Sequence, residues 1–383
     1  MSIAAYIQAL PDRYRRITTE GNYEGAIDGL RWLAISSVIA CHINSMLQNH
    51  AIITVHYTFL EAAIYNLLHG VQIFFALSGY ILSNAFFKRR NEGKTIDLNA
   101  YYLRRLTRLE PAYFIVLLFS FAVLVFVTNK YTFAALLPHL GLSMLYANNF
   151  FYLAAHPLVF PIAWSLEVEV QFYIALPILF WLYTRNLVVA RIIGLLFMAV
   201  MPLIISKQTW CVHTSLVFQT PYFFAGILLA DITNNCSQIL QKIQIKPILS
   251  NILALAAWIG TLSYTWVETR LANGSRPDVQ PIFIFILLFM VLIQGAFKSL
   301  FTNKWVCFIG GACYSIYLTH FIIISVLAKI LLKYAFSTNF LINFIFLSVF
   351  IVPAVLFGGI LFYIVIERPT MSKNWWCNKV KKK

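Results

Sequence analysis

The chain has 383 residues, of which 60% are hydrophobic and only 11% are charged, and its formal net charge is +15. Soluble globular proteins carry about 25% charged residues, so a chain with so few cannot cover a water-exposed surface. The composition excludes a soluble domain, a disordered chain and a soluble nucleic-acid-binding fold. It predicts a protein most of whose surface faces lipid.

Ten apolar stretches of membrane-spanning length follow one another along the chain. A helix needs roughly 20 mainly apolar residues to cross the hydrocarbon core of a bilayer. Such windows lie near 30–48, 68–87, 111–129, 165–184, 191–206, 215–233, 247–266, 281–297, 305–327 and 342–366. The runs are continuous and lack the alternation of barrel strands. We therefore predict an all-α, polytopic membrane protein with about ten transmembrane helices.

Two further stretches, 51–66 and 131–160, are only moderately apolar. The first contains His56 and Glu61, and the second contains two prolines and two histidines. We interpret them as interfacial or re-entrant segments on the outer side of the membrane. A true crossing at either stretch would invert the topology of everything that follows it.

The distribution of basic residues favours cytoplasmic positions for both termini. In this arrangement 23 of the 29 lysines and arginines lie on the cytoplasmic side and 6 on the outer side. This asymmetry obeys the positive-inside rule and explains most of the net charge without a ligand. We predict a basic N-terminal arm at 1–29, one membrane domain at 30–369 and a basic tail at 370–383. The arm lacks the apolar core of a cleavable signal peptide.

The first predicted span contains two ionisable side chains, Arg31 and His42. They are 11 residues apart, close to three helical turns, so they share one face about 16 Å apart along the axis. Arg31 could be an arginine that snorkels to the interface, and His42 a hydrogen-bonded core imidazole. The alternative is a functional role, because ionisable groups inside a membrane are costly.

A basic segment follows the second span and ends with Arg104, Arg105 and Arg108. The positive charge of this segment is explained by its predicted cytoplasmic location and by attraction to acidic lipid headgroups. The functional alternative is a phosphate-rich ligand, which the planar guanidinium fork suits. Arg105 and Arg108 share a face at i, i+3. The six cysteines show no CxxC pair or metal-ligand spacing, so we predict no metal.

Two later segments also contain candidate residues. Glu167 and Glu169 point about 200° apart on a helix, so at most one of them faces a given cavity. That carboxylate could be merely interfacial, or it could orient an imidazole or bind a hydroxyl. Tyr314, Tyr317 and His320 share a face, which fits either a packing stripe or a cavity lining.

Five strings of the sequence, in order, resemble the motifs of the acyltransferase-3 family of membrane acyltransferases. They are Arg31 and His42 with ten intervening residues, GVQIFFALSGYILS (70–83), RRLTRLEP (104–111), WSLEVEVQFY (164–173) and YSIYLTH (314–320), and the closing ERP (367–369) also fits. The resemblance covers roughly 26–369. Two positions depart from the pattern: Gln72 stands where an acid is frequent, and Tyr80 replaces a phenylalanine. No appended hydrolase-like domain is seen, so the chain resembles the stand-alone members.

The resemblance implies an enzyme of the bacterial cytoplasmic (inner) membrane that takes an acyl group from acyl-CoA, usually acetyl-CoA. The acceptor it implies is a hydroxyl of an envelope polysaccharide or lipid-linked glycan. Our hypothesis makes His42 the general base or acyl carrier, with Glu169 orienting His42 or the acceptor. The predicted donor-phosphate residues are Arg31, Arg104, Arg105 and Arg108, and the predicted cavity residues are Gln72, Ser78, Trp164, Tyr173, Tyr314, Tyr317 and His320. Ser78 is predicted to donate a hydrogen bond near the acyl carbonyl.

Two other functions would also place polar residues inside a helical bundle. A transporter of a glycan or small molecule predicts inverted internal repeats, and the two halves of the sequence show no convincing repeat. A scaffold or lipid-binding protein predicts tolerance of substitution at His42.

Overall fold

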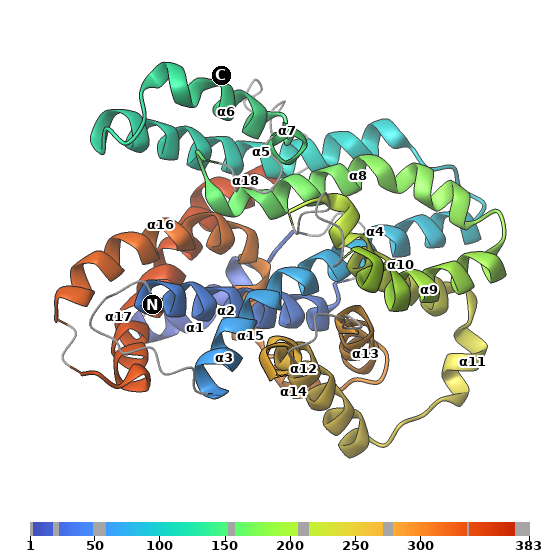
Figure 1. Ribbon diagram of the computed structural model, residues 1–383. Helices are drawn as coiled ribbons and strands as arrows, with labels where there is room; N and C mark the ends of the chain where they lie inside the picture. The colour runs from blue at the N-terminus through green and yellow to red at the C-terminus, as the bar shows by residue number, and fades with distance from the viewer. Residues whose placement is uncertain are drawn as a thin grey trace. The chain divides into compact units, whose positions relative to one another are not determined.

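The computed structural model describes residues 3–17, 23–48, 59–151, 158–205, 214–270, 279–334 and 337–371. Within these ranges every regular element is a helix, which confirms the all-α prediction. Each predicted window overlaps a helix (Figure 1), although the window at 305–327 is divided between the short helix α15 (Lys304–Gly311) and α16. These helices are α2 (Gly25–Gln48), α4 (Gly70–Asn91), α5 (Leu98–Ala122), α8 (Trp164–Tyr183), α9 (Leu187–Ile205), α10 (Leu216–Asn235), α12 (Pro247–Arg270), α13 (Gln280–Leu292), α16 (Cys313–Leu331) and α17 (Phe340–Phe362).

Seven of these helices, extended by adjoining turns in some cases, are long and apolar enough to cross a membrane within the described ranges. They contain α2, α4, α5, α8, α10, α16 and α17. The other three predicted windows fall on α9, α12 and α13, whose apolar runs are shorter: Leu187–Pro202, Pro247–Leu262 and Gln280–Leu292. A bilayer accommodates a short apolar run by local thinning at modest cost. The chain is therefore a polytopic helical membrane protein.

Short helices connect the long ones. They are α1 (Ile3–Arg13), α3 (Phe59–Tyr65), η1 (Asn66–His69), η2 (Val123–Val127), α6 (Phe133–Met144), α7 (Asn148–Phe151), η3 (Pro161–Ala163), α11 (Ser237–Lys242), α14 (Lys298–Phe301), α15 (Lys304–Gly311), η4 (Leu332–Tyr334), η5 (Tyr363–Glu367) and α18 (Arg368–Thr370). The predicted interfacial stretches fall on α3 with η1 and on α6 with α7, while 51–58 and 152–157 lie outside the described residues.

Several helices begin at residues whose side chains cap the free N–H groups of the first turn. The side chain of Asp97 accepts from the N–H of Ala100 at 3.0 Å, where α5 begins. Asn339 caps α17 by accepting from the N–H groups of Leu341 and Ile342. Short polar side chains are favoured at such positions because the first turn leaves backbone donors unpaired.

The chain divides into two compact units. The first consists of the described parts of Met1–Gly70, Arg104–Tyr113 and Phe297–Lys383, and the second of those of Val71–Leu103 and Phe114–Ala296. In the first unit α2 packs against α15, α16 and α17 (Figure 1). A Cβ atom built on Gly310 would lie 1.7 Å from the carbonyl oxygen of Asp28, so only glycine permits this approach of α15 to α2.

In the second unit α10 crosses α4 at a reciprocal pair of glycines. A Cβ on Gly226 would lie 2.0 Å from the carbonyl oxygen of Ala76, and one on Gly79 would lie 2.3 Å from the carbonyl oxygen of Phe223. The two backbones therefore touch directly, as small residues allow in membrane helices. This contact fixes the position of Gly79, which directly follows Ser78.

A buried carboxylate ties together the ends of three helices in the second unit. Asp231 of α10 is fully buried and forms a bidentate ion pair with Arg191 of α9, with N–O distances of 2.6 and 3.1 Å. It also accepts hydrogen bonds from the hydroxyl of Tyr183 at 3.0 Å and from the side-chain amide of Asn235 at 2.7 Å. The charge is therefore fully satisfied, as burial requires.

We expect Asp231→Asn to lower the free energy of unfolding by roughly 2 kcal/mol. Breaking a buried ion pair costs about 3–5 kcal/mol, and the cost is reduced here because solvent reaches part of the Arg191 side chain. The measurement is SDS titration of the purified protein in detergent micelles. Arg185→Gln, at an exposed arginine nearby in sequence, is the control, and equal stability of the two variants would contradict the prediction.

Candidate active site

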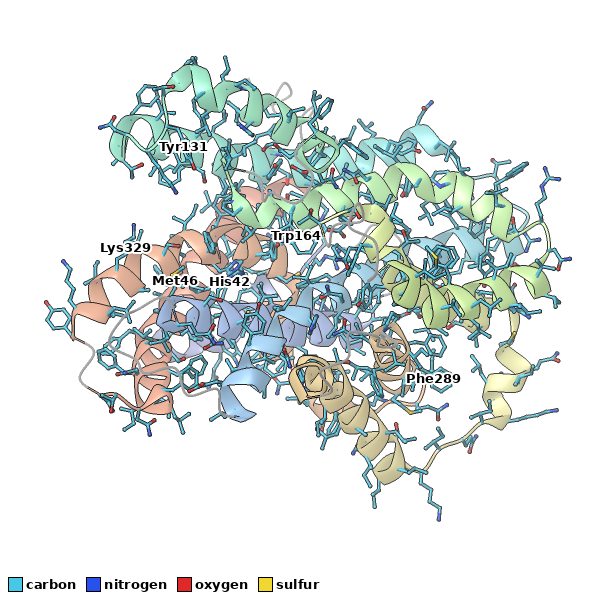
Figure 2. The ribbon with its side chains drawn as sticks, viewed as in Figure 1. His42, Met46, Tyr131, Trp164, Phe289 and Lys329 are labelled. Carbon is cyan, nitrogen blue, oxygen red and sulfur yellow. The ribbon has the colours of Figure 1, made fainter. Side chains whose placement is uncertain are left out.

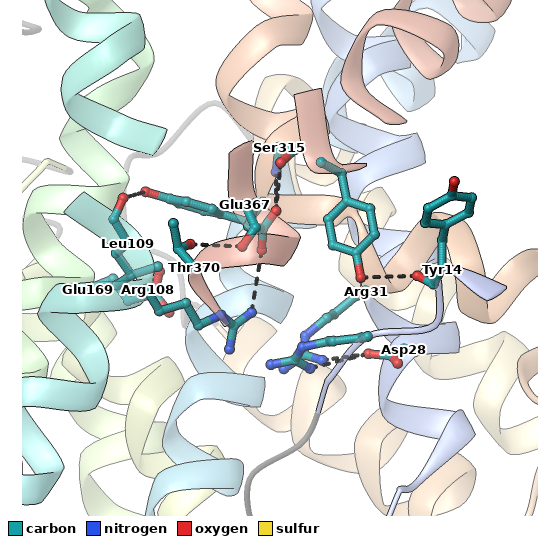
Figure 3. Close-up of polar contacts among 12 residues, drawn as sticks. Tyr14, Asp28, Arg31, Arg108, Leu109, Glu169, Ser315, Glu367 and Thr370 are labelled. Carbon is teal, nitrogen blue, oxygen red and sulfur yellow. Dashed lines mark hydrogen bonds and ion pairs between the residues drawn. The ribbon is translucent and has the colours of Figure 1, made fainter. Parts of the chain in front are cut away.

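A cluster of arginines and carboxylates occupies one end of the first unit (Figure 3). Asp28 on the first turn of α2 is 2% exposed, and its Oδ1 lies 2.5 Å from a guanidinium nitrogen of Arg31. The same oxygen lies 3.4 Å from a guanidinium nitrogen of Arg16, which follows α1. The i, i+3 spacing of Asp28 and Arg31 on one helix brings the first pair together. Arg31 is thus a half-buried, ion-paired residue rather than a side chain that snorkels freely.

The other half of the cluster is built around Glu367. This carboxylate is fully buried and lies 3.6 Å from a guanidinium nitrogen of Arg108. Its second oxygen accepts from the hydroxyl of Ser315 at 2.6 Å and from the N–H of the same residue at 3.1 Å. Glu367 ends the π-helical turn η5, and such single π turns are frequent at functional sites.

Among the described residues, the cluster brings three arginines, Arg16, Arg31 and Arg108, to two carboxylates, and each guanidinium is at most 23% exposed. Burial, together with the like charges of Arg108 and Arg31, lowers the pKa of Arg16. Guanidinium groups bind phosphate through paired N–H donors, so a cluster of three arginines is suited to bind phosphate groups.

The sequence predicted Arg31 and Arg108 here but missed three members of the cluster. Asp28 could have been found from its i, i+3 spacing to Arg31, and Glu367 from the closing ERP. Nothing local indicated Arg16. Of the other predicted arginines, Arg105 is half-buried one turn from Arg108, while Arg104 is exposed.

Two histidines from different helices lie side by side in the first unit. One of them is His42 on α2, which Figure 2 labels. Its ring lies 5.2 Å from the ring of His320 on α16, centroid to centroid, and 5.3 Å from the ring of Phe321. His320 is fully buried, and its Nδ1 lies 2.5 Å from the carbonyl oxygen of Tyr317. That geometry makes Nδ1 the donor and leaves Nε2 as an acceptor without a hydrogen-bond partner. The structure thus brings together His42 and His320, which the sequence assigned to separate motifs.

The predicted tyrosines of α16 have structural contacts. The hydroxyl of Tyr314 donates to the carbonyl oxygen of Leu109 at 2.8 Å, which fixes the arginine-bearing segment of α5. The ring of Tyr317 lies 5.4 Å from that of His320. The shared face predicted for these residues therefore lies against α5 and His42.

A carboxylate centre lies in the second unit. Glu169 of α8 is half-buried, and its Oε1 accepts short hydrogen bonds from the hydroxyls of Ser78 and Tyr173. Tyr173 is one helical turn from Glu169, whereas Ser78 comes from α4. Because Ser78 donates its single proton to Glu169, it has none left for an acyl carbonyl in this arrangement. The role predicted for Ser78 near the acyl carbonyl stays a prediction, and in this arrangement its hydroxyl supports the carboxylate.

Glu167 and Glu169 have the opposite orientations that their spacing predicted. Glu167 is fully buried and accepts from the side-chain amide of Asn148 at 2.8 Å and the N–H of Asn149 at 3.3 Å. Gln171 joins Asn149 to the carbonyl oxygen of Tyr146. This network holds α7 and the preceding turn against α8, so Glu167 is structural.

The remaining predicted cavity residues lie near this centre in sequence. The ring of Trp164, at the start of α8, lies 6.2 Å from the ring of Phe75. Gln72 is buried and its amide donates to the side-chain oxygen of Gln219 at 3.5 Å. At this position, where the family motif frequently has an acidic residue, the uncharged amide of Gln72 makes a neutral contact. Among the described residues no group of three histidine, cysteine or carboxylate side chains could hold a metal ion.

This chain is a polytopic helical membrane protein with a polar site among its helices. The site contains an arginine cluster and a pair of histidines. The sequence matches the profile of the acyltransferase domain over residues 24–364. The chain therefore belongs to the acyltransferase-3 family.

Curated relatives agree with this assignment. A Staphylococcus aureus (strain MSSA476) protein provisionally named as an O-acetyltransferase is 24% identical over 328 residues, covering 79% of this chain and 51% of its own. The peptidoglycan O-acetyltransferase OatA of Listeria monocytogenes is 28% identical over 191 residues, covering 45% of this chain and 27% of its own. The chain spans about half the length of the Staphylococcus relatives it matches. No solved structure matches it.

Proposed function

We propose that this protein transfers an acyl group, in the first instance acetyl, from acyl-CoA to a hydroxyl of a bacterial envelope glycan. Family membership and the O-acetyltransferase names of the relatives support acyl transfer. The observation that carries the proposal is that Arg31, a member of the arginine cluster, and His42 are on the same helix. A transporter would need no such pairing of an anion site with a base. The proposed location is the cytoplasmic membrane, with the arginine cluster on the cytoplasmic side.

The arginine cluster is suited to hold the donor. Coenzyme A carries a 3′-phosphate and a pyrophosphate, and guanidinium groups bind phosphate through paired N–H donors. Arg31 and His42 are both on α2, three turns apart. A phosphate held at Arg31 would let the extended pantetheine arm reach toward His42.

The chemistry assigns the proton transfer to His42. The acceptor oxygen attacks the thioester carbonyl while His42 takes its proton, the carbon–sulfur bond breaks, and the leaving thiolate takes the proton back. His42 as a transient acyl carrier is the covalent variant of the same scheme. Ring contact with His320 and Phe321 fixes the position of the imidazole.

Glu169 is the proposed contact for the acceptor. One of its oxygens already accepts from Ser78 and Tyr173, which orients the carboxylate. The half-buried carboxylate can accept a further hydrogen bond from a sugar hydroxyl. A hydrogen bond to a charged group contributes about 1.5–3 kcal/mol.

We expect Glu169→Gln to lower kcat/KM for the acceptor by roughly 10–100-fold, because the amide is a weaker acceptor for the sugar hydroxyl. The KM for acetyl-CoA should change little. Ser83→Ala is a nearby control, since Ser83 is buried on the same helix as Ser78 and its hydroxyl has no hydrogen-bond partner among the described residues. A larger effect on the donor KM than on the acceptor would contradict the assignment.

The experiment that tests the function uses inverted membrane vesicles, whose cytoplasmic face is exposed to added radiolabelled acetyl-CoA. Label appearing in the envelope glycan fraction, above vesicles without the protein, supports the proposal. Absence of label at equal protein abundance refutes acetyl transfer from acetyl-CoA. The glycan fraction that takes up label identifies the acceptor class.

A further inference from the structure

The N-terminal arm is held against the first unit by the C-terminal end of the membrane helices. Three consecutive carbonyl oxygens of the arm accept hydrogen bonds from two residues there. Arg368 donates to the carbonyl oxygens of Arg13 at 3.1 Å and Arg15 at 3.5 Å. The hydroxyl of Tyr363 donates to the carbonyl oxygen of Tyr14 at 3.2 Å, and Figure 3 draws this hydrogen bond to Tyr14 as a dashed line. The guanidinium of Arg368 also lies 5.5 Å from the centre of the Tyr14 ring. These contacts fix the backbone just before Arg16.

Only one of the three arginines in this part of the arm turns inward. Arg13 and Arg15 are exposed, whereas the side chain of Arg16 is 13% exposed. A Cβ built on Gly311 would lie 3.4 Å from Cβ of Arg16, so the arm runs directly over the turn that begins α16. The inward side chain ends at Asp28, within the arginine cluster.

Arg16 has spare donor capacity at that position. Within the described residues, its side chain makes one hydrogen bond, to Oδ1 of Asp28 at 3.4 Å, an oxygen that Arg31 already approaches to 2.5 Å. In that part of the chain, the Nε of Arg16 and the Nε of Arg108 are both buried without a hydrogen-bond partner. Buried guanidinium donors without partners are costly, and a phosphate oxygen would satisfy them.

We propose that Arg16, on the N-terminal arm, is a further phosphate-binding residue of the acyl-donor site, and that Arg368 positions it by holding the arm. The inference rests on the proposed function. Arg16 lies outside residues 24–364, which match the family profile, whereas Arg368 belongs to the closing ERP. The arm therefore adds a donor-binding group from outside the matched residues.

The test measures equilibrium binding of acetyl-CoA and of acetyl-pantetheine, which lacks all phosphates, to the full chain in nanodiscs. We expect Arg16→Gln to weaken acetyl-CoA binding about tenfold, the loss of one charge-assisted phosphate contact, and to leave acetyl-pantetheine binding unchanged. Arg13→Gln removes an exposed charge from the same arm and should leave both affinities unchanged. Arg16→Lys keeps the positive charge and replaces Arg16→Gln in the test if that variant is poorly produced. It should retain part of the affinity for acetyl-CoA.

A double-mutant cycle tests the positioning residue. Arg368→Gln alone should weaken acetyl-CoA binding, and it should add little in the Arg16→Gln background, because Arg368 acts through the arm. Equal loss for acetyl-CoA and acetyl-pantetheine in Arg16→Gln would show a merely structural role and overturn the inference. Unchanged acetyl-CoA binding in that variant would also overturn it while leaving the proposed function intact. Absence of acetyl-CoA binding by the wild-type protein would overturn both.

Discussion

Replacing His42 by alanine should reduce acetyl transfer by roughly 10²–10⁴-fold, the contribution of a positioned general base. The protein should still bind acetyl-CoA, because the arginine cluster stands at the other end of the helix from His42. Protein abundance and stability should change little, since His42 is half-buried and its contacts are with the rings of His320 and Phe321.

The measurement compares label transfer from acetyl-CoA in inverted vesicles at equal protein abundance. His139→Ala, which removes a histidine from α6 in the second unit, is the control and should transfer at the wild-type rate. Activity of His42→Ala within a few-fold of wild type would remove His42 as the base. His320→Ala should have a smaller effect than His42→Ala, because His320 is buried and acts on the position of its neighbour.

The long helices could be predicted closely because length and apolar character alone decide them. The window at 68–87 corresponds to α4 (Gly70–Asn91), and the window at 342–366 to α17 (Phe340–Phe362). The connections could not be predicted in this way. Residues 131–160 hold α6 and α7. The side-chain amide of Asn148 and the backbone N–H of Asn149, both in α7, donate to Glu167 across 19 and 18 residues of sequence. Hydropathy does not report such contacts.

The site was predictable where its contacts are local in sequence. Spacing alone places Arg31 and His42 on one face, Asp28 beside Arg31, and Tyr173 one turn from Glu169. The other partners come from distant parts of the chain: Ser78 reaches Glu169 across 91 residues. Arg16 and Glu367 come from near the two ends of the chain, so only tertiary packing places them with Arg31 and Arg108. These distant partners also set the charge balance of the arginine cluster and the orientation of the Glu169 carboxylate.

The second large effect is expected at the crossing of α4 and α10. Gly226→Ala should lower the free energy of unfolding by about 3 kcal/mol, at the upper end of the usual cost of overpacking. The added Cβ would lie 2.0 Å from the carbonyl oxygen of Ala76 and 2.5 Å from the amide nitrogen of Tyr80. Both atoms are backbone, so no side-chain rotation relieves the clash and the two helices must separate.

The same separation should reduce activity, since Ser78 lies on α4 inside this crossing and donates to Glu169 on α8. SDS titration of the purified protein measures the stability, and acetyl transfer in vesicles measures the activity. Gly141→Ala is the matched control, because a Cβ there meets no atom within 4 Å and alanine favours the helix. We expect that control to be at least as stable as the wild type. Wild-type stability of Gly226→Ala would mean that α4 and α10 are farther apart than their glycines indicate, and the support of Glu169 by Ser78 would then lose its structural basis.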